Sequence, residues 1–333
     1  MAQGSGSGRS RSTRRWLRAV AALTATALVG LLPACSGGSP AAPSEPPPTP
    51  RTGPAETRPA VRYGPVAAGP QQTLDLYLPA GDGRTVFPML ILIHGGGFVE
   101  GSSADYTEAA QQLVGEGFAV ASLNYRLSGE ARFPAGVADV KAAVRFLRVQ
   151  APAWGIDPHR FAVWGASAGG YLAATIGATG ADGTFDDPAL GNPHVSSAVQ
   201  AVVDWFGPSD FATMDAQARE AGCDEAAQQH DAPDSPESLW LGGAVPAVPD
   251  LVRTANIAHQ VGAARSLPPF LLVHGTADCT VPAGQSRELR DALTARGARV
   301  TLTEVEGAGH GDPRIDAEQT APSLDFVRSV LGR

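Results

Sequence analysis

A series of short apolar runs, separated by longer amphipathic stretches, dominates the chain from about residue 61 to residue 333. Runs of this kind are typical of strands that are buried on both faces of a parallel sheet. An earlier run, residues 73–79, alternates apolar and polar residues instead, which predicts an outer antiparallel strand. The mostly continuous runs span residues 89–94, 118–125, 160–165, 199–207, 269–275 and 300–307.

Between the runs lie the predicted helices, at residues 104–116, 136–151, 168–179, 284–296 and 316–331. This alternation predicts one α/β domain over residues 61–333, built as a three-layer sandwich around a mostly parallel central sheet. Residues 208–266 interrupt the pattern, because they are rich in Pro, Asp and Ala and separate two strands. An insertion of that length favours a lid or cap over a structureless loop.

A serine surrounded by small residues follows the run at 160–165, in the order Gly165-Ala166-Ser167-Ala168-Gly169. The preceding run is strand-like and the following stretch is helix-like, so Ser167 falls on the turn between them. A nucleophile on such a turn needs small neighbours, because the turn is too sharp for larger side chains. The pattern predicts a nucleophilic Ser167, and the alternative is a serine that only caps the helix.

Three glycines follow the buried run at 89–94, in the sequence His94-Gly-Gly-Gly-Phe98. Backbone N–H groups in such a loop can point inward without obstruction by side chains. Two donors aimed at a developing oxyanion stabilise a transition state by several kcal/mol. An ordinary glycine-rich strand exit is the alternative, and the presence of Ser167 favours the oxyanion loop.

A serine hydroxyl is a weak nucleophile until a positioned base takes its proton. The chain has seven histidines, and most lie in the glycine loop, in other loops or in the insertion. His310 lies between Gly309 and Gly311 directly after the last apolar run, where a flexible loop can bring an imidazole back over the sheet edge. We therefore expect His310 to be the base.

The acid that orients this imidazole should follow a strand located between the serine and the histidine in the chain, in the order Ser, Asp, His. Asp278 follows the run at 269–275 and meets that requirement. Its expected role is to hold the tautomer of the imidazole and stabilise the imidazolium. Asp204, at the end of the preceding run, is the rival for this role.

Taken together, these motifs resemble the α/β-hydrolase superfamily. The resemblance is strongest to its hormone-sensitive-lipase-like and carbohydrate-esterase branch, which includes bacterial feruloyl and acetyl-xylan esterases. It extends from about Thr73 to the end of the chain, and the long insertion departs from a short-lid pattern. The motifs are HGGGF, LNYRLSGEARFPAGVADVKAAVRFLR, GIDPHRFAVWGASAGGYLA, VDWFGPSDF, HGTADCTVP and GAGHG. The resemblance implies Ser167 as nucleophile, Asp278 as acid and His310 as base, with an oxyanion hole made by the backbone N–H groups of Gly96, Gly97 and Ala168.

Residues 1–34 resemble the signal peptide of a bacterial lipoprotein. An arginine-rich start is followed by an apolar stretch and then by Leu32-Pro-Ala-Cys35, in which Cys35 would carry the lipid. The apolar stretch is shorter than the roughly 20 residues that a membrane span requires. A plain secretory signal with a stray cysteine is the alternative, and the Thr13-Arg14-Arg15 triplet leaves the choice between general and twin-arginine export open.

The next segment, residues 35–60, is rich in proline and predicts a semi-extended tether. We therefore expect an exported protein, either a cell-surface lipoprotein or a secreted one. Apart from Cys35, only Cys223 and Cys279 remain, an even pair in an oxidising compartment. They predict a disulfide that joins the insertion to the loop of the acid.

Net charge and residue spacing exclude several other functions. The formal net charge is -8, and no basic stripe is present to neutralise phosphates, so nucleic acid is not expected as a partner. No zinc-binding spacing occurs, and residues 181–187 are interpreted as a solvated turn rather than a Ca²⁺ loop. We expect no metal and no cofactor, and contact with a membrane only through a lipid on Cys35.

The sequence thus predicts a serine esterase that hydrolyses short-chain carboxylic esters through an acyl-enzyme. The substrate would be a small-molecule ester or an ester carried by a polysaccharide, such as an acetyl or feruloyl ester. A peptidase or amidase of the same fold is one alternative, and a catalytically silent surface binding module is another. Trp205, Phe206 and Phe211 could either line an acyl pocket or pack in the core.

Overall fold

The structure is a computed structural model, and it describes residues 48–65, 69, 71–225 and 229–332. The predicted signal peptide at residues 1–34, Cys35 and the first part of the predicted tether lie outside these residues.

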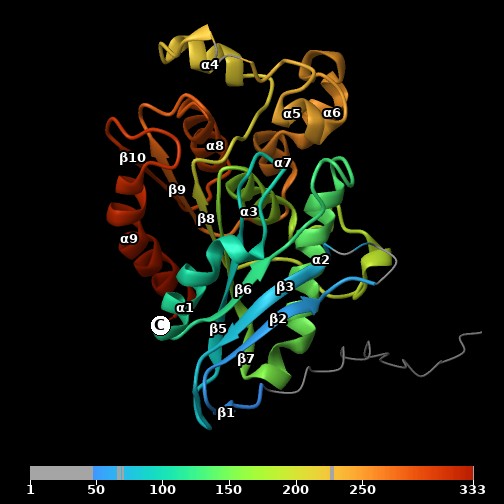
Figure 1. Cartoon of the computed structure of the whole chain (residues 1–333), viewed down its shortest axis with the longest axis vertical. Helices are drawn as coiled ribbons and strands as arrows, with labels where there is room; N and C mark the ends of the chain where they lie inside the picture. Colours follow the sequence, from blue (N-terminus) through green and yellow to red (C-terminus); the bar gives the residue numbers. More distant parts are fainter. Residues whose placement is uncertain (1–47, 66–68, 70, 226–228, 333) are drawn as a thin grey trace, which may run out of the picture. The chain divides into compact units, whose positions relative to one another are not determined.

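A mostly parallel sheet forms the centre of the described domain (Figure 1). Within the described residues it has eight strands in the order β10-β9-β8-β7-β5-β6-β3-β2. Strand β3 runs antiparallel to both of its neighbours, β2 and β6, as predicted, but it is not the outermost strand, because β2 lies outside it at the edge of the sheet. The strands are β2 (Glu56–Arg62), β3 (Thr73–Leu78), β5 (Phe87–Ile93), β6 (Ala119–Leu123), β7 (Ile156–Ala166), β8 (Ala201–Trp205), β9 (Phe270–Gly275) and β10 (Val300–Val305). A separate two-stranded ribbon pairs β1 (Thr52–Gly53) with β4 (Gly81–Asp82).

Strand β2 corrects the predicted boundary between tether and domain at residue 60. It pairs with β3 from Glu56 opposite Leu78 to Arg62 opposite Thr73, so the folded domain includes residues 48–60. The sequence of this strand is polar because β2 lies at the edge of the sheet and most of its side chains are exposed or half-buried. Pro59 is compatible with an edge strand, which does not need every N–H for pairing.

Helices cover both faces of the sheet, so the predicted three-layer α/β sandwich is confirmed. Alternate residues of β5 serve the two cores, with Ile91 and Ile93 facing one and Leu90 and Leu92 facing the other. The first core is covered by α2 (Ala135–Gln150), α3 (Ala168–Thr179) and α8 (Gly284–Ala295). The second is covered by α1 (Thr107–Gly115) and α9 (Pro313–Leu331). In the part of the chain that the structure describes, no helix is long and apolar enough to cross a membrane.

The insertion at residues 208–266 folds into short helices rather than a loop. They are α4 (Met214–Glu220), α5 (Pro236–Leu241), α6 (Pro249–Ala255) and α7 (Ile257–Ala263). In Figure 1 the helices α4, α5 and α6 lie beyond one end of the sheet, whereas α7 packs against α3 and α8. Trp240 of α5 is fully buried and stacks on Phe98, with ring centroids 4.4 Å apart. The insertion is therefore fixed directly onto the loop that follows β5.

Candidate active site

Ser167 lies on a tight turn between β7 and α3, in a backbone conformation with φ of 57° and ψ of -125°. Its N–H donates to the carbonyl oxygen of Trp205 at 2.8 Å, which ties the turn to the end of β8. A Cβ atom on Gly165 would lie 2.1 Å from the carbonyl oxygen of Gly169, and one on Gly169 would lie 2.0 Å from that of Ile93. The glycines at both ends of the predicted motif are therefore required by close backbone contacts.

His310 lies in the loop between β10 and α9 and contacts both predicted partners. Its Nε2 is 3.0 Å from Oγ of Ser167, and its Nδ1 is 2.7 Å from Oδ2 of Asp278. Because Nδ1 faces a carboxylate, it carries the proton in the neutral imidazole and leaves Nε2 free to accept the serine proton. The arrangement can therefore deprotonate the Ser167 hydroxyl.

Asp278 is only 1% exposed and sits in a cradle of donors just beyond the end of β9. Its Oδ1 accepts the backbone N–H groups of Thr280 and Val281, both at 2.9 Å. Burial alone would raise the pKa of this carboxyl, but hydrogen bonds from His274 and His310 outweigh burial and lower the pKa to about 2. Asp278 is thus negatively charged at neutral pH and able to stabilise an imidazolium.

Asp204, the rival for the same role, lies at the end of β8 and is fully buried. Its Oδ1 accepts the N–H of Gly207 at 3.0 Å, whereas its Oδ2 has no hydrogen-bond partner among the described residues. Burial raises the pKa of Asp204 to about 7. Within the described structure it makes no hydrogen bond to His310, so the carboxylate that meets the imidazole is Asp278.

The glycine loop follows β5 and passes beside the serine. A Cβ atom on Gly95 would come within 3.3 Å of the Cβ atom of Ser167. Gly96 and Gly97 have positive φ angles of 95° and 57°, in the region that favours glycine. A Cβ atom on Gly96 would also lie 2.3 Å from the carbonyl oxygen of Glu100. The positive φ angles and the lack of room for a Cβ atom together explain why the loop is a run of glycines.

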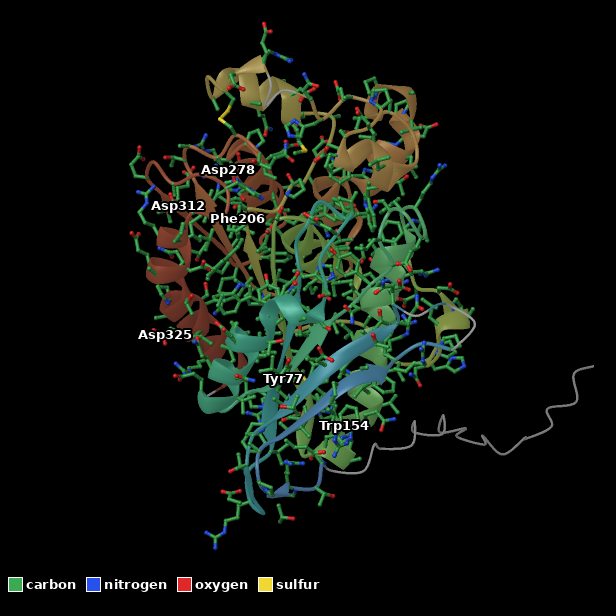
Figure 2. All side chains as sticks on the ribbon, in the orientation of Figure 1. Tyr77, Trp154, Phe206, Asp278, Asp312 and Asp325 are labelled. Carbon is green, nitrogen blue, oxygen red and sulfur yellow. A yellow bond between two sulfur atoms is a disulfide. The ribbon has the colours of Figure 1, made fainter. Side chains whose placement is uncertain are left out.

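The glycine loop, the serine turn and His310 border one cavity of about 380 Å³. Its wall includes Gly96, Gly97, Ser167, Ala168 and His310, so the predicted oxyanion donors border the same space as the serine and the imidazole. Figure 2 shows Asp278 and Phe206 at the end of the sheet that faces the inserted helices. The cavity therefore opens at the end of the sheet where parallel strands of such folds present their ligand sites.

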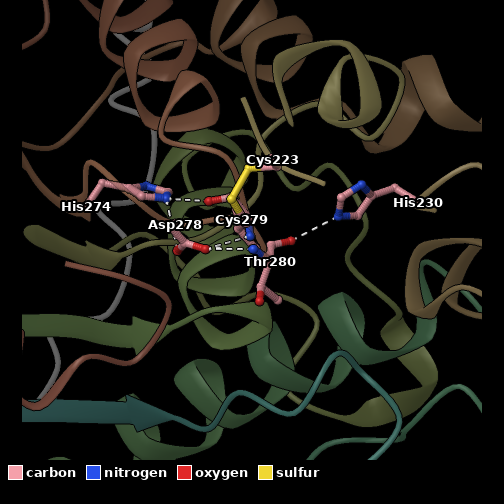
Figure 3. The surroundings of a disulfide bond; sticks show 7 residues. Cys223, His230, His274, Asp278, Cys279 and Thr280 are labelled. Carbon is pink, nitrogen blue, oxygen red and sulfur yellow. Dashed lines mark hydrogen bonds and ion pairs between the residues drawn. A yellow bond between two sulfur atoms is a disulfide. The ribbon is translucent and has the colours of Figure 1, made fainter. Parts of the chain in front are cut away.

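Cys223 and Cys279, which the sequence paired, are joined by a disulfide with a Cα–Cα distance of 5.7 Å (Figure 3). A second link runs parallel to it, because His230 of the insertion binds the carbonyl oxygen of Thr280 through Nε2 at 2.9 Å. The loop that carries Asp278 is thus attached to the insertion by a covalent bond and a hydrogen bond.

The sequence did not decide whether three aromatic residues line a pocket or pack in the core, and it gave no indication of several residues that border the cavity. Trp205 and Phe211 are buried and pack in the two cores, whereas Phe206 packs against the His310 ring with centroids 4.8 Å apart. Glu237 and Thr280 also border the cavity, and the sequence analysis assigned them no role. Thr280 lies in the HGTADCTVP motif, which could have indicated it, but no sequence signal marks Glu237.

Comparisons with known proteins identify the relatives of this chain. A sequence model of the BD-FAE family matches residues 74–293. Esterase LipC of Mycobacterium tuberculosis (strain ATCC 25618 / H37Rv) is 30% identical over 266 residues, which cover 79% of this chain and 62% of LipC. The chain thus spans about three fifths of the length of that curated relative.

Two solved structures resemble the domain closely. One is described as a truncated form of carbohydrate esterase from gut microbiota, with a TM-score of 0.70 and 32% identity over 84% of this chain and 97% of that chain. The other is a bifunctional GH43-CE protein of Bacteroides eggerthii, with a TM-score of 0.71 and 30% identity over 82% of this chain and 38% of that chain. The match at residues 74–293 shows that the chain belongs to the BD-FAE family, has the α/β-hydrolase fold and is kin to carboxylic ester hydrolases.

Proposed function

We propose that this chain is a serine esterase and that Ser167 is its nucleophile. The observation that carries the proposal is the hydrogen-bonded sequence from Ser167 to His310 at 3.0 Å and from His310 to Asp278 at 2.7 Å. As Oγ attacks the ester carbonyl carbon, Nε2 of His310 takes the hydroxyl proton and Asp278 stabilises the imidazolium. His310 then donates that proton to the departing alcohol, which leaves an acyl group on Ser167.

Deacylation repeats these steps with water in place of the serine. His310 takes a proton from a water molecule as the water oxygen attacks the acyl carbon, and the imidazolium then returns that proton to Oγ of Ser167 as the bond from Oγ to the acyl carbon breaks and the carboxylic acid leaves. The negative charge that develops on the carbonyl oxygen in both steps would be stabilised by the backbone N–H groups of Gly96, Gly97 and Ala168. All three residues border the cavity of Ser167, which supports this assignment.

The proposed substrates are short-chain carboxylic esters, including acetyl and feruloyl esters on polysaccharides. The similarity to a protein described as a carbohydrate esterase supports this class. The cavity volume of about 380 Å³ is at the lower end of the usual range for small-molecule sites, about 300–1,000 Å³, which fits a short acyl group.

A panel of esters graded by acyl length, together with acetylated xylan, methyl ferulate and a peptide anilide, tests this function. We expect turnover of p-nitrophenyl acetate that declines as the acyl chain lengthens, together with release of acetate or ferulate from the carbohydrate-related esters. Turnover of the anilide in preference to every ester would instead identify a peptidase or amidase. The Ser167→Ala variant, purified in the same way, is the control for contaminating esterases.

We further propose that the protein is exported, with Cys35 as the lipid-bearing N-terminus of the mature chain. The disulfide between Cys223 and Cys279 supports an oxidising compartment, where such bonds persist. Mass spectrometry of the protein from its native host tests the proposal. We expect a mature chain that begins at Cys35 with attached acyl groups, whereas a chain retaining residues 1–34 would contradict export by this route.

A further inference from the structure

Glu237 is a carboxylate in the wall of the active-site cavity that the proposed chemistry does not use. It lies in the first turn of α5, and only 7% of the residue is exposed. Its Oε2 is buried and has no hydrogen-bond partner within the described part of the chain. Burying a polar atom without a partner costs free energy, and a ligand group that supplies the partner recovers that free energy on binding.

A second cavity, of about 420 Å³, adjoins the first beside Glu237. The two cavities share Pro236, Glu237 and Thr280 in their walls. The wall of the second cavity contains polar side chains, among them His230 and Asp234. A substrate group that extends from Ser167 past Glu237 would therefore meet polar side chains there.

The chemistry of ester cleavage indicates which half of the substrate would extend this way. The departing alcohol receives its proton from His310, so it must lie on the imidazole side of the cavity. Thr280 belongs to the loop that begins at Asp278, the partner of His310. Because the wall shared with the second cavity contains Thr280, the alcohol portion of the ester is the part that would reach Glu237.

We propose that Glu237 determines specificity by accepting, at Oε2, a hydrogen bond from a hydroxyl group on the alcohol portion of the ester. This inference rests on the proposed esterase function and assigns a sugar-like, polyhydroxylated alcohol as the preferred leaving group. A buried acceptor discriminates in this way because an alcohol without a matching hydroxyl leaves it unpaired.

The protonation behaviour of Glu237 favours a hydroxyl over a cation as the partner. Burial raises the pKa of this carboxyl, although the nearby His230 acts in the opposite direction. An ammonium group would require the ionised carboxylate throughout. A hydroxyl can donate to the ionised form or accept from the protonated form, so it pairs with both.

Glu237 is not needed to hold α5 in place. The hydroxyl of Ser235 caps the helix by accepting the N–H of Ser238 at 3.0 Å. The stacking of Trp240 on Phe98 anchors the other end of the same helix. A purely structural role for Glu237 as an acidic residue in the first turn therefore predicts a loss of stability on its removal, whereas a ligand-binding role predicts a gain.

The test compares two acetate esters that differ in the hydroxyl groups of the alcohol, namely methyl β-xyloside monoacetate and cyclohexyl acetate. We expect Glu237→Leu to lower kcat/KM for the xyloside ester about 10- to 100-fold and to change that for cyclohexyl acetate less than threefold. Glu237→Gln keeps the shape and one acceptor oxygen, and it should retain the preference within a few-fold. Glu108→Leu is the matched control, because this glutamate also lies in the first turn of a helix, α1, but is exposed and borders neither cavity, so its loss should leave the ratio unchanged.

Thermal unfolding provides an independent readout. Glu237→Leu should melt at a higher temperature than the wild type, since it removes a buried carboxyl oxygen, Oε2, that has no hydrogen-bond partner among the described residues. A lower melting temperature with both esters affected equally would show a structural role and overturn the inference. An unchanged preference for the xyloside ester would overturn it as well. If the wild-type protein hydrolyses neither ester, the proposed esterase function itself fails, and the two failures are thereby distinguished.

Discussion

Cys279 is the residue next to Asp278 in the chain, and its disulfide partner Cys223 lies in the insertion, just after α4. The carboxylate that holds His310 is therefore covalently coupled to the segment that covers the cavity (Figure 3). If the insertion moves, we expect the loop of Asp278 to move with it and to displace the imidazole of His310.

Removal of the disulfide should lower both stability and activity. The bond closes a loop with a sequence separation of 56 residues, and bonds of this kind contribute about 2–4 kcal/mol. We expect Cys223→Ser and Cys279→Ser to lower the melting temperature to a similar extent, and the double variant to be no worse than either. Calorimetry of all three proteins checks this, and additive losses would show that the cysteines act independently of the bond.

The two candidate acids differ in their contact with the imidazole, so their amide variants should differ in activity. Asp278→Asn removes the charge at 2.7 Å from Nδ1 of His310 and favours the wrong tautomer, which should lower kcat about 10⁴-fold. Asp204→Asn keeps the acceptor for the Gly207 N–H and should lower kcat less than tenfold. Steady-state kinetics on p-nitrophenyl acetate decides, and a larger loss in Asp204→Asn would reverse the assignment of the acid.

Asp204 and Asp278 should make the free energy of unfolding depend on pH in opposite directions, each over a different pH range. Asp204 has a pKa raised to about 7 by burial, so the native state binds its proton more tightly than the unfolded state. Stability should therefore fall as pH rises from about 4 to about 7, and this fall should be absent in Asp204→Asn. Asp278 has a pKa lowered to about 2, so its contribution is present above about pH 4 and is lost as pH falls towards 2.

Urea unfolding of the wild type and Asp204→Asn across pH 3–8 isolates the contribution of Asp204. The difference in unfolding free energy between the wild type and Asp204→Asn should grow with pH between 4 and 7. A difference that is constant over this range would mean that Asp204 is ionised throughout and would contradict its raised pKa.

The glycine loop should tolerate no side chain at Gly97. This residue has a φ angle of 57°, and a Cβ atom there would lie 3.2 Å from the Cβ atom of Pro236. Because the loop must shift to accept it, Gly97→Ala should lower kcat/KM by about 10²-fold through misplaced oxyanion donors. Gly309→Ala, beside His310 but with no atom within 4 Å of an added Cβ, is the control and should keep most of the activity. Equal effects of the two substitutions would contradict a special role for the loop.

The features predicted from sequence were those determined by local patterns. The pattern of apolar residues identified seven strands of the central sheet within a few residues. Five of them, β5 to β9, are largely buried on both faces, and strands of that kind are continuously apolar. Strand β3 was found by its alternation, and the edge strand β10 is mostly exposed or half-buried, although its run predicted burial on both faces. The turn at Ser167 could be predicted because Gly165 and Gly169 lie so close to neighbouring backbone atoms that a larger residue would not fit. Those atoms belong to the turn itself and to β5. Strand β2 could not, since an exposed edge strand needs no apolar pattern and here contains a proline.

Features that depend on distant parts of the chain could not be predicted. Lys141 is fully buried and pairs with Asp186 at 3.1 Å, in the segment that the sequence suggested was only a solvated turn. Phe206 reaches the His310 ring, and Glu237 the wall of the cavity, only once the insertion and the loops beyond β8 and β10 are folded together. Their roles follow from tertiary contacts, for which a single sequence carries no periodic or spacing signal.

The central claim is that Ser167 is the nucleophile, and covalent labelling tests it most directly. The protein is incubated with a fluorophosphonate, digested, and mapped by mass spectrometry. We predict one adduct per chain, located on Ser167, with loss of p-nitrophenyl acetate turnover in proportion to labelling and no adduct in Ser167→Ala. An adduct on another residue that accompanies the loss of activity, or an active protein that resists labelling at Ser167, would contradict the account.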